Sequence, residues 1–197
     1  MKKTAAVIAA AVAVLAGCSS QPSATSHDGN ADHDHPSSAS AGADATTHDD
    51  ADVMFAQMMI PHHTQAVQMS DILLAKQGVD PRVVQLATEI KAAQAPEIQQ
   101  MQGWLTSWGS PATAPMNHDS MQGMVSEKDI EALRNAPGPE AAKLYVTQMI
   151  AHHEGAITMA QDEIATGQYG PAIELSHAIV ETQQKEIDTM KAILQTL

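Results

Sequence analysis

The sequence predicts an all-α protein, an antiparallel four-helix bundle built from a duplicated helical hairpin. Aromatic residues make up only 3% of the chain although hydrophobic residues make up 44%, a composition more typical of helices than of β-sheets. Two long segments resemble each other at an offset of about ninety residues. Apolar residues in both segments recur at the three- and four-residue spacing of a helix face. These observations together predict one helical core.

The N-terminus is expected to be an export signal, residues 1–17. Two lysines precede an apolar run that is too short to span a membrane as a mature helix. The run ends in Leu15-Ala16-Gly17-Cys18, which resembles a bacterial lipobox. Cys18, the only cysteine, is therefore expected to carry a lipid, although an ordinary signal with an incidental cysteine is the alternative. The mature protein would be a lipoprotein facing the periplasm or cell exterior, in contact with the membrane only through this anchor.

Residues 18–50 are expected to form a disordered tether. After Cys18 they contain Ser, Ala, Thr, Gly and Pro with many Asp and His, and no large apolar side chain that could build a core. The His-Asp tracts could gather a divalent cation, and a solvated acidic linker explains them equally well.

Helix signals divide the bundle domain, residues 51–197, into two halves, about 52–108 and 139–197, joined by a loop, 109–125. Asp80 before Pro81 predicts a helix start, and Ser126 with Asp129 predicts a short capped helix. The expected helices run from about Asp50 to Gln77, from Pro81 to Trp108 with a kink at Pro96, from Ser126 to Asn135, from Pro139 to Gly167, and from Pro171 to the C-terminus.

The repeat places a Met-x-x-His-His unit in each half, at Met59 to His63 and at Met149 to His153. The seam spacing directs His62 and His152 into the core. The following residues, His63 and His153, point about 100° further round the helix and are expected to reach a neighbouring helix or the surface. The seams of the second and fourth long helices are polar at their centres, at Gln94, Glu97, Gln183 and Glu186.

Two interpretations of this polar seam remain open. In the structural one, His62 and His152 hydrogen-bond to the two glutamates and fix the register of the helices. In the other, imidazoles and thioethers bind a soft cation, Cu(I), and carboxylates behind them orient the histidines. The candidate ligands in the bundle are Met59, His62, His63, Met69, Met149, His152, His153 and Met159, and the candidate supporting residues are Gln94, Glu97, Gln183 and Glu186.

The connecting loop supplies a second group of candidate ligands, Met116, His118, Met121 and Met124. Methionines exposed on a polar loop fill no core, and in an oxidising compartment they are liable to sulfoxidation. Three thioethers and an imidazole suit Cu(I) or Ag(I). The alternative is that the loop folds over the bundle as a hydrophobic lid.

Charge and motifs narrow the function classes. The net charge of −13 repels phosphate backbones, so no nucleic-acid partner is expected. The segment from Glu174 to His177 is the only match to the Glu-x-x-His unit of di-iron sites. No phosphate-binding loop, hydrolase elbow or His-Glu-x-x-His zinc motif is present. We therefore expect a binding protein with no catalytic residues; a copper-dependent redox enzyme would need a substrate pocket and an open metal position.

The His-His segments, with the residues from Gln94 to Met101, resemble the family named domain of unknown function 305, over about Asp52 to Leu197. The family is regarded as having a ferritin-like four-helix fold, and some exported members are similar to periplasmic copper-resistance proteins that bind Cu(I) and Ag(I). The resemblance implies copper or silver binding through Met59, His62, His63, Met69, His152, His153 and Met159.

The expected function is copper sequestration, tolerance or transfer outside the cytoplasm, with an envelope protein that donates or accepts copper as a partner. The alternative is an interaction bundle of the cell envelope whose buried His-Glu network is purely structural. The sequence leaves the oligomeric state open.

Overall fold

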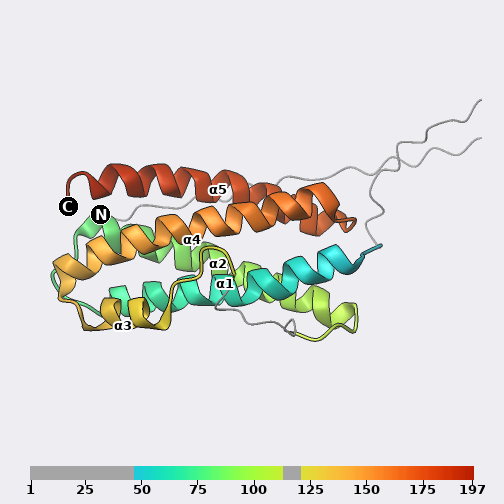
Figure 1. The fold of residues 1–197 in the computed structure, drawn as a ribbon, viewed down its shortest axis with the longest axis horizontal. Helices are drawn as coiled ribbons and strands as arrows, with labels where there is room; N and C mark the ends of the chain where they lie inside the picture. Colours follow the sequence, from blue (N-terminus) through green and yellow to red (C-terminus); the bar gives the residue numbers. More distant parts are fainter. Residues whose placement is uncertain (1–46, 113–120) are drawn as a thin grey trace, which may run out of the picture. The chain divides into compact units, whose positions relative to one another are not determined.

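The computed structural model describes residues 47–112 and 121–197, which belong to one compact unit (Figure 1). The predictions for the export signal, for Cys18, for most of the tether and for Met116 and His118 lie outside these residues. The described residues form five helices and no strand: α1 Asp50–Leu74, α2 Pro81–Ser107, α3 Glu127–Asn135, α4 Gly138–Thr166 and α5 Gly170–Leu194.

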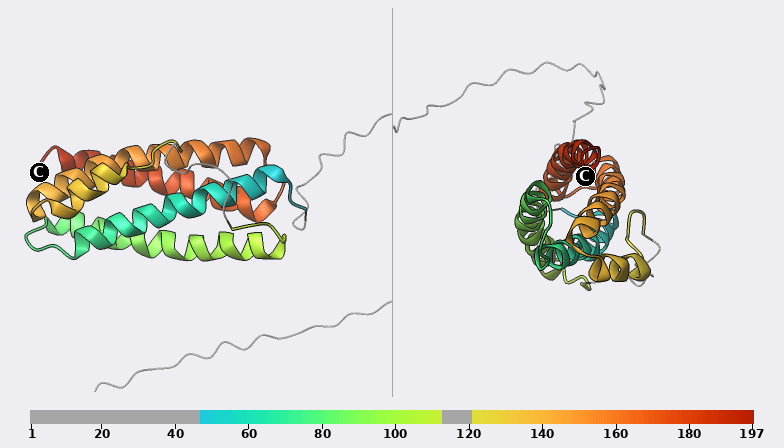
Figure 2. Two further views of the ribbon diagram at one scale, coloured as in Figure 1. Left: turned by 60° about the horizontal axis from the view of Figure 1, so that its bottom comes forward. Right: turned by 90° about the vertical axis from the view of Figure 1, so that its left-hand side faces the viewer.

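The four long helices form the antiparallel bundle that the sequence predicts. α1 packs along α2, α4 packs along α5, and α1 packs against α4, whereas α2 and α5 hardly touch. Figure 2 shows the four helices arranged around a common core, with the short α3 outside them against α1 and α4. Within residues 47–112 and 121–197, none of the helices combines the length and the hydropathy that a membrane span requires.

Most helix ends fall within one or two residues of their predicted positions. Asp80 caps α2 by accepting a hydrogen bond from the Arg82 N–H, and Ser126 caps α3 by accepting one from the Asp129 N–H. Two ends differ by three residues, because α1 ends at Leu74 rather than at Gln77 and α5 ends at Leu194 rather than at the C-terminus. The Lys76 N–H bonds to the Leu73 carbonyl at 3.0 Å, and this tightened last turn ends α1 early.

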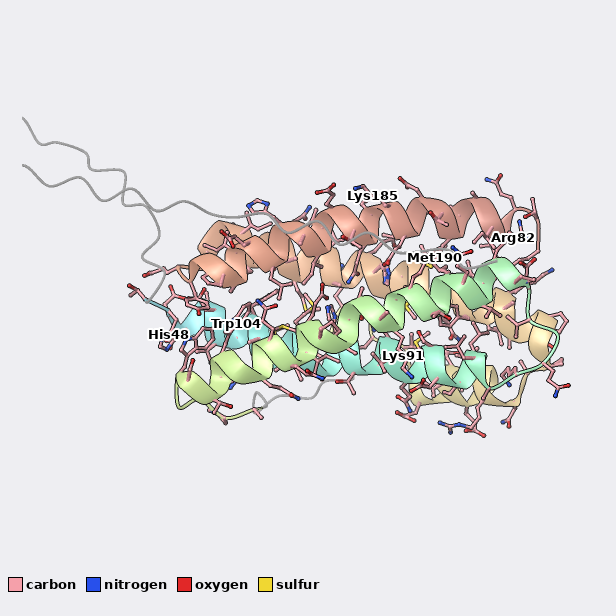
Figure 3. The ribbon with its side chains drawn as sticks, turned by 180° about the vertical axis from the view of Figure 1, so that it is seen from behind. His48, Arg82, Lys91, Trp104, Lys185 and Met190 are labelled. Atoms are coloured by element: carbon pink, nitrogen blue, oxygen red, sulfur yellow. The ribbon has the colours of Figure 1, made fainter. Side chains whose placement is uncertain are left out.

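The apolar core is divided into two clusters by a polar layer. One cluster contains Trp104 and Phe55, and the other contains Met190 and Tyr145. Trp104 and Met190 are labelled toward opposite ends of the bundle in Figure 3. The layer between them consists of the four histidines of the two His-His motifs with Gln94 and Gln183, all buried. The predicted polar centre of the seam therefore lies at the middle of the core.

Asp52 ties the start of α1 to the turn between α4 and α5. Its carboxylate is fully buried and accepts hydrogen bonds from the N–H groups of Asp49 at 2.7 Å and Tyr169 at 2.9 Å. Burial opposes its ionisation, but a hydrogen bond with Glu163 and the backbone donors outweigh burial and lower the pKa of Asp52. Asp52 is thus a fully partnered structural carboxylate, in contrast to its neighbour Glu163.

Candidate metal centre

The centre of the polar layer is a pair of facing histidines from α1 and α4. His62 and His152 are fully buried, as the seam spacing predicts, and their ring centroids lie 3.7 Å apart with the planes tilted by 35°. Because α1 and α4 run antiparallel against each other, the repeated motif brings these corresponding positions face to face. The two imidazoles are therefore close enough to bind one small ligand together.

The second histidine of each motif reaches a glutamate on the partner helix of its own hairpin. His63 Nε2 lies 2.8 Å from Glu97 Oε2, and His153 Nε2 lies 2.6 Å from Glu186 Oε2. The structural interpretation, in which His62 and His152 hydrogen-bond to these glutamates, is therefore wrong in its choice of histidines, whereas His63 and His153 do reach a neighbouring helix. A helix turns about 100° per residue, so the histidines one position later face α2 and α5, while His62 and His152 face each other.

Burial keeps the central imidazoles neutral. Desolvation, reinforced by the neighbouring His63 and His153, lowers the pKa of His62 to about 3. The Gln122 backbone near the ring opposes this shift but does not meet the ring nitrogens with hydrogen-bond geometry. Desolvation and the same cluster of imidazoles lower the pKa of His152 well below its usual value. At neutral pH both rings therefore carry the lone pair that a metal requires.

Ring nitrogens in this layer lack hydrogen-bond partners. Neither nitrogen of His62 or of His152 makes a hydrogen bond, and Nδ1 of His63 and of His153 is also unpaired. A buried polar atom without a partner costs about 1–3 kcal/mol, so a purely structural network would have satisfied these atoms. Unpaired neutral imidazoles fit a soft or borderline cation as ligand.

A narrow cleft between α2 and α5 lies on one side of the layer. Gln94 and Glu97 line it from α2, and Gln183 and Glu186 line it from α5. Its volume is about 10 Å³, room for about one water molecule or one small ion. Both amide atoms of Gln94 and Oε1 of Gln183 are buried without partners. The predicted supporting residues thus surround a polar opening beside the histidines.

The described parts of the connecting loop, residues 109–112 and 121–125, are both hydrogen-bonded to α1, and the second part also packs against α4. Gln57 Nε2 donates to the Pro111 carbonyl at 2.8 Å, and Gln65 bonds to both the N–H and the carbonyl of Val125. Met121 is only 7% exposed and Met124 is half-buried. The prediction of an exposed methionine is therefore wrong for Met121, where the lid alternative describes the structure.

Two glycines permit this close approach of the loop. Gly123 adopts φ +85°, and a Cβ there would lie 2.8 Å from the Ala151 carbonyl of α4. A Cβ on Gly155 would collide with the Gln122 carbonyl. The loop backbone thus rests directly on the turn of α4 that carries His152.

Gly155→Ala is expected to displace this loop and to lower the free energy of unfolding by about 1–3 kcal/mol, because neither backbone can yield easily. Gly103→Ala is the matched control, since Gly103 also lies in a helix but a Cβ there meets nothing. That control should raise the free energy by about 0.5–1 kcal/mol. Urea denaturation of the two variants checks both values, and equal effects would contradict the close packing.

The four seam methionines flank the histidine layer. Met59 and Met159 belong to the cluster that contains Phe55, and Met69 and Met149 belong to the other. Within residues 47–112 and 121–197, no three His, Cys, Asp and Glu side chains are arranged to hold a metal ion together. Glu174 and His177, the only Glu-x-x-His pair, are exposed on α5.

The fold and the site together define a class of protein, the four-helix bundles with facing His-His motifs on α1 and α4. The chain belongs to the family described as domain of unknown function (DUF305), whose model matches residues 52–194. No curated protein matches the chain in sequence.

Solved structures of similar proteins share this fold. A DUF305 protein from Streptomyces coelicolor is 32% identical, with a TM-score of 0.70 over 74% of this chain and 93% of that one. A DUF305 fragment from Deinococcus radiodurans is also 32% identical, with a TM-score of 0.70 over 76% and 99% of the two chains. CopM in its Cu(I)-bound form is 28% identical, with a TM-score of 0.62 over 74% and 96%. CopM has also been solved with Cu(II) and with Ag bound.

The sequence interpretation missed a group of polar and thioether side chains at the end of the bundle where α1 begins. Met54, Met58 and Glu163 lie there around a cavity. Met54 and Met58 are off the core seam, and their four-residue spacing was the one sequence signal that they share a helix face. Glu163 comes from α4, more than a hundred residues later, so no local pattern joined it to them.

Proposed function

We propose that this protein binds monovalent copper, with silver able to take its place, at the facing imidazoles of His62 and His152. The observation that carries the proposal is the pair of fully buried, neutral rings, 3.7 Å apart, without a hydrogen bond to any of their four nitrogens. The copper- and silver-bound forms of the similar protein CopM support the choice of metal.

The His-Glu pairs prepare two further donors. When the Nε2–H of a neutral His63 donates to Glu97, the lone pair is left on Nδ1, which has no partner. The same holds for His153 with Glu186. A carboxylate that orients a histidine in this way also makes the ring a better donor. The buried thioethers of Met59, Met69 and Met149 flank the layer and favour the monovalent ion.

The role we propose for this binding is sequestration of copper or its transfer to another protein of the cell envelope, not catalysis. The apparent lipobox at Cys18 supports export and tethering, and the Streptomyces coelicolor relative is assigned as secreted. Soft thioether ligands exchange readily, and this suits transfer. The polar cleft between α2 and α5 offers the layer a short route to solvent.

An anaerobic titration of the full chain with Cu(I) against a chromophoric chelator tests this proposal. The double variant His62→Leu/His152→Leu is expected to lose the tightest equivalent of Cu(I), because both central donors are gone. His177→Leu is the control, since His177 is exposed on α5 away from the layer, and it should bind like the wild type. An unchanged tightest equivalent in the double variant would overturn the assignment to the core.

A further inference from the structure

A second cavity lies at the end of the bundle where α1 begins and α4 finishes. His48 and Trp104, labelled in Figure 3, mark this end. The cavity has a volume of about 200 Å³, enough for several water molecules or a partly hydrated ion. Its lining comes from α1 and α4 alone: Ala51, Met54, Phe55, Met58, Met159, Asp162, Glu163 and Thr166.

Three thioethers converge on this cavity. Met54 and Met58 are one helical turn apart on the same face of α1, and Met159 lies opposite on α4. Met54 is 51% exposed and is the one large hydrophobic side chain exposed among the described residues. Core filling explains a buried methionine but not an exposed one. Thioethers that share a solvent-open cavity can act as ligands for a soft ion.

The cavity also contains a buried carboxyl group without a hydrogen-bond donor. Glu163 is only 2% exposed, no N–H group donates to either of its oxygens, and the group that it faces is another carboxyl, that of Asp52. The backbone N–H groups of Gln168 and Tyr169 donate to Asp52 instead. Both carboxyl groups lie beside Gly167, because a Cβ added there would be 2.9 Å from Asp52 Oδ1 and would collide with Glu163. Burial, with Asp52 beside it, raises the pKa of Glu163 to about 8. A cation is the partner that this cluster of acids lacks.

We propose that this cavity is a second soft-cation site, in which Met54, Met58 and Met159 bind a monovalent ion such as Ag(I) or Cu(I) and Glu163 supplies a balancing carboxylate. Binding involves no redox step, and the proton that Glu163 holds at neutral pH is released to solvent when the ion binds. Asp162 at the rim adds negative charge that favours a cation over an anion.

The cavity is distinct from the histidine layer. Met159 follows His152 by seven residues, which is two helical turns or about 10 Å along α4. None of the four buried histidines lines the cavity. Met159 nevertheless packs in the same apolar cluster as Met59, three residues before His62.

The test is an Ag(I) titration of the full chain, labelled with ¹³C at the methionine methyl groups and observed by NMR. The signals of Met54, Met58 and Met159, assigned by single Leu substitutions, should shift together. They should shift equally in the His62→Leu/His152→Leu variant, because the site does not use those rings. The double variant therefore separates the two sites, because it lacks the core site but should still show the Ag(I)-induced shifts of the three methionine signals.

Matched variants complete the test. Glu163→Gln should weaken the Ag(I) affinity read from these three signals by about tenfold or more. Met101→Leu is the control, since Met101 is buried in the same apolar cluster but does not line the cavity, and it should change nothing. If Met54 and Met58 stay unmoved while other methionines respond, or if they respond only when His62 and His152 are present, the second site does not exist.

Discussion

Replacing His62 and His152 together by Leu should raise the free energy of unfolding of the metal-free protein, by about 2–4 kcal/mol. Four buried ring nitrogens without partners cost about 1–3 kcal/mol for each group left unsatisfied. Leucine removes that cost and fills most of the same space with apolar atoms, as when other buried polar clusters are replaced. A residue pair that destabilises the fold is expected where a ligand, not packing, explains its presence.

The matched variant is His63→Leu/His153→Leu, which should change stability in the opposite direction. Those rings bond to Glu97 and Glu186, so their loss strips two largely buried carboxylates of partners. Urea denaturation with a metal chelator present measures both variants. A destabilised His62→Leu/His152→Leu protein would mean that the central pair is structural, and the interaction-bundle alternative would then be favoured.

Acidification below pH 6.5 should destabilise the metal-free protein steeply. The pKa of His62 falls to about 3 on folding, and that of His152 is also lowered, whereas both rings titrate near 6.5 when unfolded. Below pH 6.5 the imidazoles of His62 and His152 therefore bind protons in the unfolded chain but stay neutral in the folded protein. Stability is complete above this pH and is lost as pH falls toward 3, by about 1.4 kcal/mol per pH unit for each ring.

The loss for both rings is about 4 kcal/mol between pH 6.5 and 5, a large part of the stability of an ordinary domain. Chemical denaturation at a series of pH values measures it. Glu163 contributes with the opposite sign, since its raised pKa makes folding less favourable as pH rises toward 8. The His62→Leu/His152→Leu variant keeps that contribution and should lose only the acid sensitivity. An equal slope in both proteins would show that the central rings are protonated when folded.

Periodicity predicted the fold and the central pair because both depend on which face of a helix is apolar. Met59, His62, Ala66 and Met69 follow the seam spacing, and all four are buried as predicted. The capping residues Asp80 and Ser126 likewise mark helix starts by chemistry that acts within one turn. Such local signals are readable without coordinates.

Contacts between helices were less predictable. Whether His62 or His63 meets Glu97 depends on the rotation of α1 relative to α2, and one residue changes the direction by about 100°. Met121 is buried because Gly123 and Gly155 let the loop backbone approach α4, which neither glycine reveals alone. The absence of partners for the central ring nitrogens is likewise a property of the assembled core.

The most direct test of the central claim is a crystal structure of the protein loaded with Ag(I), with the ion located by its anomalous scattering. We expect a strong peak in contact with the imidazoles of both His62 and His152. Additional peaks beside Met54 and Met58 would be compatible with that result. A fully loaded crystal with silver elsewhere and an empty central pair would contradict the claim that these buried imidazoles are the metal site.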